Sequence, residues 1–277
     1  MTLARTGDLV GGPGAVLAFN VITLEHAEGI ADGLSAAGVG GILQVSENAV
    51  RFHGGRMAPL VAACREVAAA ADVPVSVHLD HVQDVALARQ VVAEAGRLGI
   101  SSLMVDAAHL PYEENVATTA ELAAAGHAQG LWVEAELGEI GGKDGAHAPG
   151  VRTDPDEAAS FVAGTGVDGL AVAVGSSHAM TTATARLDHD LIARLAERLP
   201  VPLVLHGSSG VPVDGLRAAV AAGIRKINVG TALNVGYTAQ VRRYLAGDEK
   251  VTDPRKYLAG ARTAIRDQVA DLTAALR

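Results

Sequence analysis

Three histidines each follow a short apolar run in this chain. They are His81 in VPVSVHLDH, His178 in DGLAVAVGSSH and His206 in VPLVLHGSSG. If the three runs are parallel strands of one α/β barrel, their carboxyl ends meet at one mouth and the imidazoles converge there. One such histidine is more often a core residue, but three at three strand ends suit a catalytic zinc site with an open ligand position. We therefore predict that they bind a divalent metal, preferably zinc.

Carboxylates accompany these histidines. Strand alternation sends Asp80 and His81 to opposite sides, so both reach the metal only if the chain bends at the strand end. Asp80 is the best candidate for a general base, because a nearby metal would keep it ionised at neutral pH. Glu134 and Glu136 share one strand face, and burying both is costly without cations or hydrogen bonds. We expect at least one of them to hold the metal or to orient its ligands.

Two segments rich in small residues end the last two predicted strands. HGSSG covers residues 206–210 and NVGT covers residues 228–231. In α/β barrels, the loops after the seventh and eighth strands often bind phosphate through backbone amides at helix starts. Each motif alone is weak, because turns use the same residues. Their joint position favours a phosphate-binding site.

The elements that would position these residues alternate regularly along the chain. Apolar, β-branched runs predict eight strands, near residues 16–20, 40–45, 74–79, 101–105, 131–136, 168–174, 202–206 and 224–229. Ala-rich segments with helical spacing predict helices near 23–37, 57–71, 84–97, 114–129, 154–164, 188–198, 212–222, 231–246 and from 254 to the end. This alternation implies parallel strands joined by right-handed crossovers, and eight repeats close a barrel. We predict an α/β fold, a (β/α)8 TIM barrel with extra terminal helices, as one domain over residues 1–277.

Local signals refine this outline. For the helix at 84–97, Asp84 is the expected N-cap, and Gly96 and Gly99 are expected to help end it. The connections at 138–154 and 175–188 are longer than usual and leave carboxyl ends of strands. They are candidate active-site loops.

Composition limits the possible functions. The chain has 22 Lys and Arg against 31 Asp and Glu, without a basic block, so we expect no nucleic-acid partner. Cys64 is the single cysteine, which excludes an intrachain disulfide and indicates a buried structural residue. No apolar stretch reaches the roughly 20 residues of a membrane span, and the N-terminus lacks the apolar core of a signal peptide. We expect a cytoplasmic protein that does not bind a membrane.

Several segments, in unbroken order, resemble the class II, metal-dependent ketose-bisphosphate aldolases, the fructose- and tagatose-bisphosphate enzymes. These segments are AFNV (18–21), QVSE (44–47), HLDH (78–81), MVDAAHLPYEENV (104–116), VEAELGEIGG (133–142), VGSSH (174–178), LVLHGSSG (203–210), INVGT (227–231) and DPRKYL (253–258). The resemblance covers nearly the whole chain.

The resemblance implies a role for each matching residue. The implied zinc ligands are His81, His178 and His206, with Glu136 joining in some metal states and Asp106 as a nearby carboxylate. Asp80 matches the acid/base that removes the proton from the C4 hydroxyl during cleavage. The implied substrate-binding residues are Asn20 and Asn228 for positioning, Gly207, Ser209 and Thr231 for the dihydroxyacetone phosphate end, and Ser46 and Arg255 for the far phosphate. The family supplies this arginine from a neighbouring subunit, so we expect a homodimer or homotetramer.

Three departures from the family pattern affect the expected chemistry. Ala179 replaces the usual glycine after the middle histidine, where it could crowd the phosphate or an accompanying Na⁺ or K⁺. The loop reads GGKDG where the family usually carries Glu as the C3 acid/base, so either Asp144, one methylene shorter, is brought closer by loop closure or another group takes the role. Gly230 stands where some fructose-specific members carry Asp and some tagatose members carry Ala. These changes concern efficiency and sugar preference.

Three functions follow from the resemblance. The leading one is a zinc aldolase that cleaves a ketose 1,6-bisphosphate, with fructose 1,6-bisphosphate as first candidate, to dihydroxyacetone phosphate and glyceraldehyde 3-phosphate. The second is an aldolase of the same mechanism for tagatose bisphosphate or another dihydroxyacetone-phosphate-dependent reaction. The third is a non-catalytic phosphosugar-binding protein. A lysine-based aldolase is disfavoured, because Lys226 lies within a strand and Lys143 in a glycine-rich loop.

Overall fold

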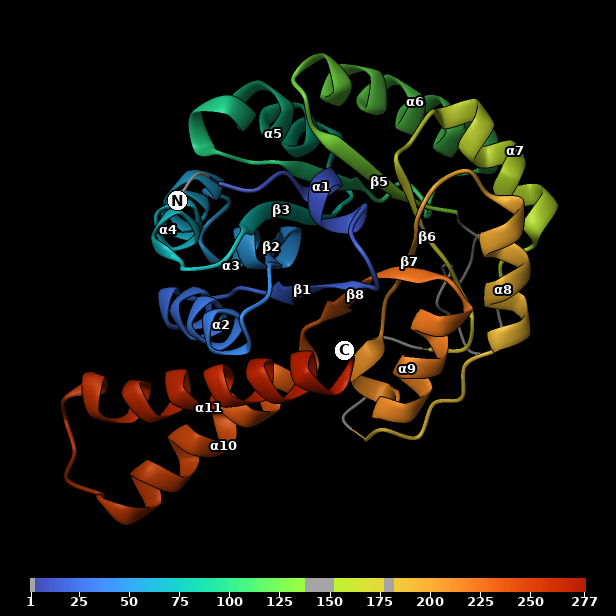
Figure 1. Cartoon of the computed structure of the whole chain (residues 1–277). Helices are drawn as coiled ribbons and strands as arrows, with labels where there is room; N and C mark the ends of the chain where they lie inside the picture. The colour runs from blue at the N-terminus through green and yellow to red at the C-terminus, as the bar shows by residue number, and fades with distance from the viewer. Residues whose placement is uncertain (1–2, 138–151, 177–181) are drawn as a thin grey trace.

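The strands form a closed parallel barrel in a computed structural model that describes residues 3–137, 152–176 and 182–277. Each strand pairs with its neighbours in sequence order, and β8 closes on β1 (Figure 1). The strands are β1 (Val16–Asn20), β2 (Gly41–Ser46), β3 (Val75–Val82), β4 (Ser102–Val105), β5 (Trp132–Glu136), β6 (Gly169–Ala171), β7 (Leu203–Leu205) and β8 (Ile224–Val229). The predicted (β/α)8 barrel is confirmed.

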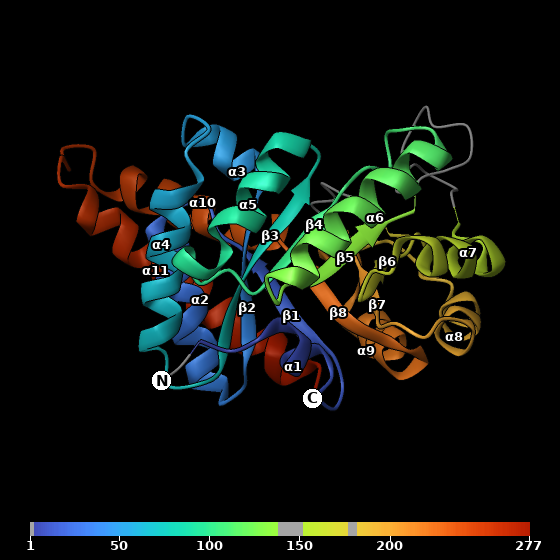
Figure 2. The same ribbon diagram turned by 90° about the horizontal axis from the view of Figure 1, so that it is seen from above.

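Helices surround the barrel. They are α1 (Thr6–Val10), α2 (Leu24–Ala37), α3 (Glu47–Phe52), α4 (Met57–Ala70), α5 (Val85–Leu98), α6 (Tyr112–Ala128), α7 (Pro155–Thr165), α8 (His189–Arg198), α9 (Val213–Ala222), α10 (Thr231–Gly247) and α11 (Pro254–Ala275). In both ribbon views, α10 and α11 form an arm that projects from one side of the barrel (Figures 1 and 2). Within the described parts of the chain, no helix is long and apolar enough to cross a membrane.

Three short helical segments were not predicted from the sequence. α1 and α3 have five and six residues, and a 3-10 turn covers Ser208–Gly210. Segments this short do not span enough turns to show helical periodicity. α1 lies at the end of the barrel where the strands begin (Figure 2), so it closes that end.

β6 is shorter than the predicted strand at 168–174. Ala173 exchanges hydrogen bonds with Thr153 just before α7, instead of continuing the ladder: its amide donates to the Thr153 hydroxyl at 2.8 Å, and its carbonyl accepts from the Thr153 amide at 3.0 Å. The strand therefore ends early, at Ala171.

The predicted N-cap of α5 and one of the two glycines predicted to end this helix are confirmed, and the other glycine is not. The Asp84 carboxylate accepts hydrogen bonds from the amides of Ala86 and Leu87, so it is the N-cap. Gly99 ends the helix in the left-handed conformation, at φ 68°. Gly96 lies inside the helix, so the prediction that it helps to stop the helix is wrong. An isolated glycine lowers helix stability without ending the helix when the flanking residues pack well.

The barrel interior changes character along its axis. Near α1 lie two small apolar clusters that both contact Trp132: Val10, Val16, Ala18 and Ile42, and Met104, Ala171 and Val204. The buried hydroxyls of Thr6, Ser76 and Ser102 hydrogen-bond together at the same end. Toward the carboxyl ends of the strands the interior becomes polar and buried, with Gln44, His78, Asp80, Glu134, Glu136 and Lys226. The main hydrophobic core lies outside the barrel wall, against the helices. This polar half of the interior is where the sequence placed the site.

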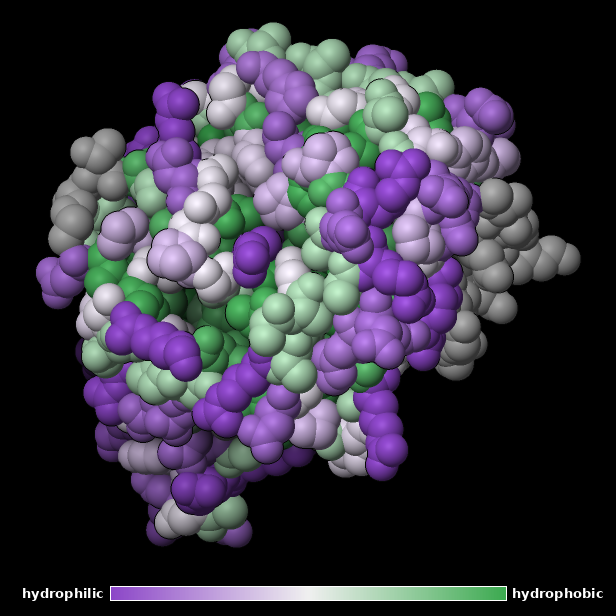
Figure 3. Space-filling model, turned by 45° about the vertical axis from the view of Figure 1, so that its right-hand side comes forward, coloured by the Kyte–Doolittle hydropathy of each residue, from purple (hydrophilic) through white to green (hydrophobic). Residues whose placement is uncertain are grey.

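The surface fits a barrel wrapped in amphipathic helices. Hydrophilic side chains cover much of the face in Figure 3, and hydrophobic ones gather in smaller areas, some of them around a hollow.

Cys64 on α4 is fully buried, and burial raises the pKa of its thiol to about 12. The expectation of a structural cysteine is therefore confirmed.

Close packing of α2 on α11 yields a stability prediction. A Cβ atom added at Gly33 would lie 2.6 Å from the carbonyl oxygen of Arg266 and 2.7 Å from Cβ of Val269. Backbone cannot yield easily, so Gly33→Ala is expected to lower the free energy of unfolding by about 1–3 kcal/mol. The matched control is Gly260→Ala on α11, where nothing lies within 4 Å of the new methyl group. It should be neutral or stabilise by up to about 1 kcal/mol in urea denaturation, and equal midpoints for the two variants would contradict the prediction.

Candidate active site

The end of β3 is bent where Asp80 and His81 reach the barrel mouth. The pairing register between β3 and β4 shifts between Leu79 and Val82. Among the described residues, His81 is the only non-glycine residue with a positive φ, at 49°. This backbone conformation costs about 1–3 kcal/mol, and it is typical of functional sites that the surrounding structure holds in place. The predicted bend is therefore present, and it brings both side chains to the same site.

Glu47 holds the bent segment from the neighbouring strand end. Its buried carboxylate accepts hydrogen bonds from the amides of Gln83 at 2.6 Å and Asp84 at 2.9 Å, and Arg51 contacts its other oxygen. These amides directly follow the bend at His81. This role could not be predicted from the sequence, because it consists of hydrogen bonds to backbone amides more than 30 residues further along the chain, and no sequence motif reports them.

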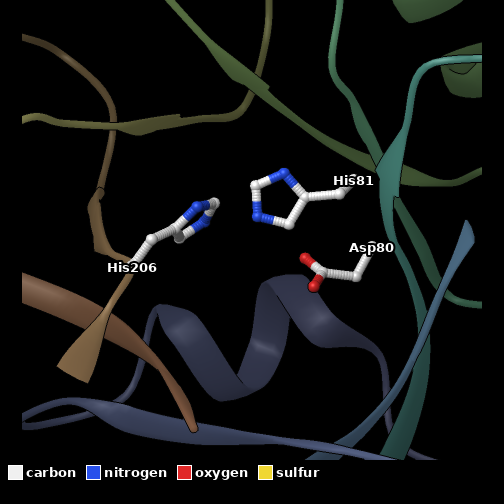
Figure 4. Close-up of side chains that lie close together, drawn as sticks. All are labelled: Asp80, His81 and His206. Atoms are coloured by element: carbon white, nitrogen blue, oxygen red, sulfur yellow. The ribbon is translucent and has the colours of Figure 1, made fainter. Parts of the chain in front are cut away.

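Two of the predicted histidines face each other across the mouth. His81 on β3 and His206 after β7 have ring centroids 4.6 Å apart at an angle of 67°, with Asp80 beside them (Figure 4). The ligand atoms of Asp80, His81 and His206 all lie within 4.8 Å of one another. Those of His81, Asp106 and Glu136 form a second such group. His81 is common to both groups, so the two together define one cluster of possible metal ligands.

Carboxylates orient both imidazoles. Nδ1 of His81 lies 2.9 Å from the carboxylate of Asp106. Nε2 of His206 lies 3.0 Å from Glu134, and its Nδ1 lies 3.7 Å from Glu136. The paired glutamates therefore differ in position: Glu136 borders the cluster, and Glu134 lies behind His206, where a second carboxylate typically fixes a metal-binding ring.

Asp80 is buried and held by amide donors. Gln44 donates to one carboxylate oxygen and Asn228 to the other, both at 3.2 Å. Burial alone would raise the pKa of Asp80. The neighbouring charges of His81 and Lys226 and the contact with His78 lower the pKa by more than burial raises it, so it lies well below the ordinary range. Asp80 is therefore an ionised carboxylate at neutral pH, as a general base must be.

His81 shows how strongly the cluster favours a cation. Burial lowers its pKa, but Asp80, Asp106 and Glu136 act in the opposite direction and raise the pKa to about 10. Three carboxylates around one imidazole therefore stabilise positive charge at this point. A divalent metal would meet the same requirement.

The predicted substrate residues Asn20, Gly207, Ser209, Asn228 and Thr231 line one pocket together with Asp80 and His81. The Ser209 hydroxyl accepts a hydrogen bond from the amide of Ala232, in the first turn of α10, at 3.0 Å. Gly207 is left-handed, at φ 66°, and Thr231 is the first residue of α10. A helix start beside hydroxyl groups is a suitable environment for a phosphate.

Ser46 and Arg255, the other two predicted substrate residues, are not among the residues that line this pocket. Ser46 pairs with Asp80 across the sheet, and its hydroxyl caps α3 by accepting from the amide of Ala49. Arg255 lies at the start of α11 on the projecting arm, exposed and bonded to Asp253 at 2.8 Å. His178, Ala179 and Asp144 lie outside the described residues.

A parallel barrel with histidines, carboxylates and a phosphate-type pocket at the carboxyl ends of its strands is typical of barrel enzymes, whose active sites lie at this face. The chain belongs to the class II fructose-bisphosphate aldolase family, whose model matches residues 11–277. It is an enzyme of the aldehyde-lyase class.

Individual relatives agree with this assignment. The chain is 35% identical over 260 residues to the D-tagatose-1,6-bisphosphate aldolase subunit GatY of Klebsiella oxytoca, covering 92% of this chain and 89% of the relative. The crystal structure of the YdjI aldolase from Escherichia coli K12 superposes with a TM-score of 0.82 at 28% identity, covering 99% of this chain and 97% of that one. A putative fructose-1,6-bisphosphate aldolase from Coccidioides immitis gives a TM-score of 0.78 at 27% identity, covering 95% and 89%.

Proposed function

We propose that this protein is a zinc-dependent aldolase that reversibly cleaves a ketose 1,6-bisphosphate to dihydroxyacetone phosphate and glyceraldehyde 3-phosphate. One observation carries the proposal: His81, His206 and Asp80 converge at the barrel mouth beside a pocket lined by Ser209 and Thr231. This arrangement would place metal ligands, a base and a phosphate-type site along one pocket.

The donor set fits zinc. His81 and His206 would hold the metal with His178, and Glu136 and Asp106 are close enough to His81 to join them. Imidazole nitrogens with one or two carboxylates are ligands that zinc commonly takes. When bound, zinc would act as a Lewis acid on the substrate's oxygen atoms.

Asp80 would perform the proton transfer of the cleavage step. As the bond between C3 and C4 breaks, its carboxylate takes the proton of the C4 hydroxyl, and C4 becomes the carbonyl carbon of the aldehyde. Gln44 and Asn228 hold the carboxylate for this transfer. Asp144 is the candidate acid that returns a proton to C3.

The sugar has two candidates. Fructose 1,6-bisphosphate is the first candidate from the sequence, and the 35% identical relative that is named a tagatose-1,6-bisphosphate aldolase subunit supports the second. The two sugars differ at C4, whose hydroxyl would lie beside Asp80. A non-catalytic phosphosugar-binding protein is the alternative of another class.

A homodimer or homotetramer is part of the proposal. The arm of α10 and α11 carries Arg255 and the exposed side chains of Val235 and Leu245. Packing against a second subunit would cover these apolar groups and could bring Arg255 to that subunit's substrate. Light scattering of the purified protein tests the assembly, and a monomer at micromolar concentration would contradict it.

The function is tested with purified, zinc-loaded protein. We expect cleavage of at least one of the two bisphosphates, loss of activity with a chelator, and recovery on adding zinc. The ratio of the two kcat/KM values identifies the preferred sugar. Activity that survives complete metal removal would contradict the zinc mechanism, and binding of both sugars without turnover would favour the non-catalytic alternative.

A further inference from the structure

Lys226 takes no direct step in the aldolase scheme above, yet its ammonium group lies fully buried inside the barrel. The side chain is 0% exposed, and its Nζ lies 2.8 Å from Glu134 and 2.7 Å from the amide oxygen of Asn228. Burying an ion pair costs several kcal/mol per ion before attraction offsets it, and aliphatic residues usually fill barrel interiors. A buried charge at this position is better explained by the groups that it orients than by stability.

On the metal side, Lys226 acts through Glu134. Oε2 of this carboxylate accepts from Lys226, and Oε1 lies 3.0 Å from Nε2 of His206. An ionised carboxylate only accepts hydrogen bonds, so Nε2 must carry the proton. His206 then presents the lone pair of Nδ1 on the side of Glu136, at the cluster of possible ligands. The tautomer of His206 therefore follows from its hydrogen bond to Glu134, whose other oxygen Lys226 holds.

On the base side, Lys226 orients an amide. An ammonium group only donates, so the atom of Asn228 that faces it must be the amide oxygen. The amide nitrogen of Asn228 is thereby turned toward Asp80, to which it donates at 3.2 Å. The reverse orientation would place the amide oxygen against the carboxylate of Asp80, which is repulsive. Lys226 thus sets the direction of the hydrogen bonds on both sides of the site.

We propose that Lys226 is a positioning residue that fixes the tautomer of His206 through Glu134 and the amide orientation of Asn228 beside Asp80. The inference rests on the proposed function for the roles of His206 and Asp80. The geometry itself is a continuous run of buried contacts from His206 through Glu134, Lys226 and Asn228 to Asp80.

The test compares Lys226→Met with Lys250→Met, a matched change of an exposed lysine. For each variant, zinc affinity is measured by competition with a chromophoric chelator, and kcat and KM are measured at saturating zinc. In Lys226→Met we expect zinc affinity to fall about 10- to 100-fold, as is typical when a group supporting a metal ligand is lost. We also expect kcat to fall at least tenfold with a smaller change in KM. Lys250→Met should match the wild type.

The double variant Lys226→Met/Glu134→Gln keeps the inference testable if Lys226→Met alone does not fold. It removes both buried charges together, a replacement that proteins commonly tolerate. The glutamine oxygen can still accept from Nε2 of His206, so zinc affinity should return toward the wild-type value. The orientation of Asn228 stays uncontrolled, so kcat should stay low.

A folded Lys226→Met variant that keeps either wild-type zinc affinity or wild-type kcat overturns the inference, as does a variant in which only the melting temperature falls. If Lys226→Met does not fold, a double variant with wild-type kcat overturns it. Failure of the proposed function gives a different result, since the wild-type protein itself would then cleave neither sugar. Zinc affinity would still report on the link between Lys226 and His206 in that case.

Discussion

Asp80→Asn is expected to lower kcat for ketose-bisphosphate cleavage by about 10²- to 10⁴-fold, the usual contribution of a general base. Asparagine has nearly the same shape, so the contact with Gln44 can persist. Its amide cannot take the proton from the C4 hydroxyl. Asp80 is the only carboxylate on β3, so no other carboxylate of this strand can take its place as the base.

The measurement is steady-state kinetics at saturating zinc, with zinc content determined on the same samples. KM and bound zinc should stay near the wild-type values, since the variant keeps the predicted ligands His81 and His206. The matched control is Asp84→Asn, because asparagine is an equally good N-cap for α5 and activity should be unchanged. An Asp80→Asn enzyme with more than a tenth of the wild-type kcat would show that the base lies elsewhere.

The fold could be predicted from the sequence because the signals were local and repeated. β1 and β8 have the predicted bounds, and the strand and helix alternation fixes the barrel. α1 could not be predicted in this way. Its role depends on contacts with residues far along the chain, such as the 2.6 Å hydrogen bond between the hydroxyls of Thr6 and Ser102. No periodic pattern reports such a contact.

The residues of the site also differ in whether local sequence signals or contacts between distant residues determine them. Residues at strand ends, such as His81, Asp80 and His206, could be found because parallel strands bring their carboxyl ends together. Of the supporting residues, Glu134 could be predicted because it shares a strand face with Glu136, and others could not, since each acts through a partner on another strand. Gln44 donates to Asp80 from β2, Glu47 holds the backbone after β3, and Lys226 on β8 bonds to Glu134 on β5.

The second large effect is expected from His81→Asn, which removes a predicted zinc ligand without disturbing the backbone. His81 has a φ of 49°, a left-handed conformation in which asparagine is among the most favoured non-glycine residues. Alanine at this position would combine ligand loss with backbone strain. His81→Asn separates the two effects, so a change in activity can be assigned to the imidazole.

Loss of the imidazole should lower zinc affinity and reduce cleavage by about 10³-fold or more, because Lewis-acid stabilisation is worth several kcal/mol and each 1.4 kcal/mol is tenfold in rate. The matched control is His127→Asn on α6, an exposed histidine bonded to Asp168 away from the cluster, which should keep zinc and activity. Thermal unfolding with and without zinc completes the test: the metal should raise the melting temperature of the wild type and of His127→Asn, and raise that of His81→Asn much less. If His81→Asn binds zinc as tightly as the wild type and cleaves the sugar at the same rate, His81 is not a ligand, and the metal must be held by other residues at the barrel mouth.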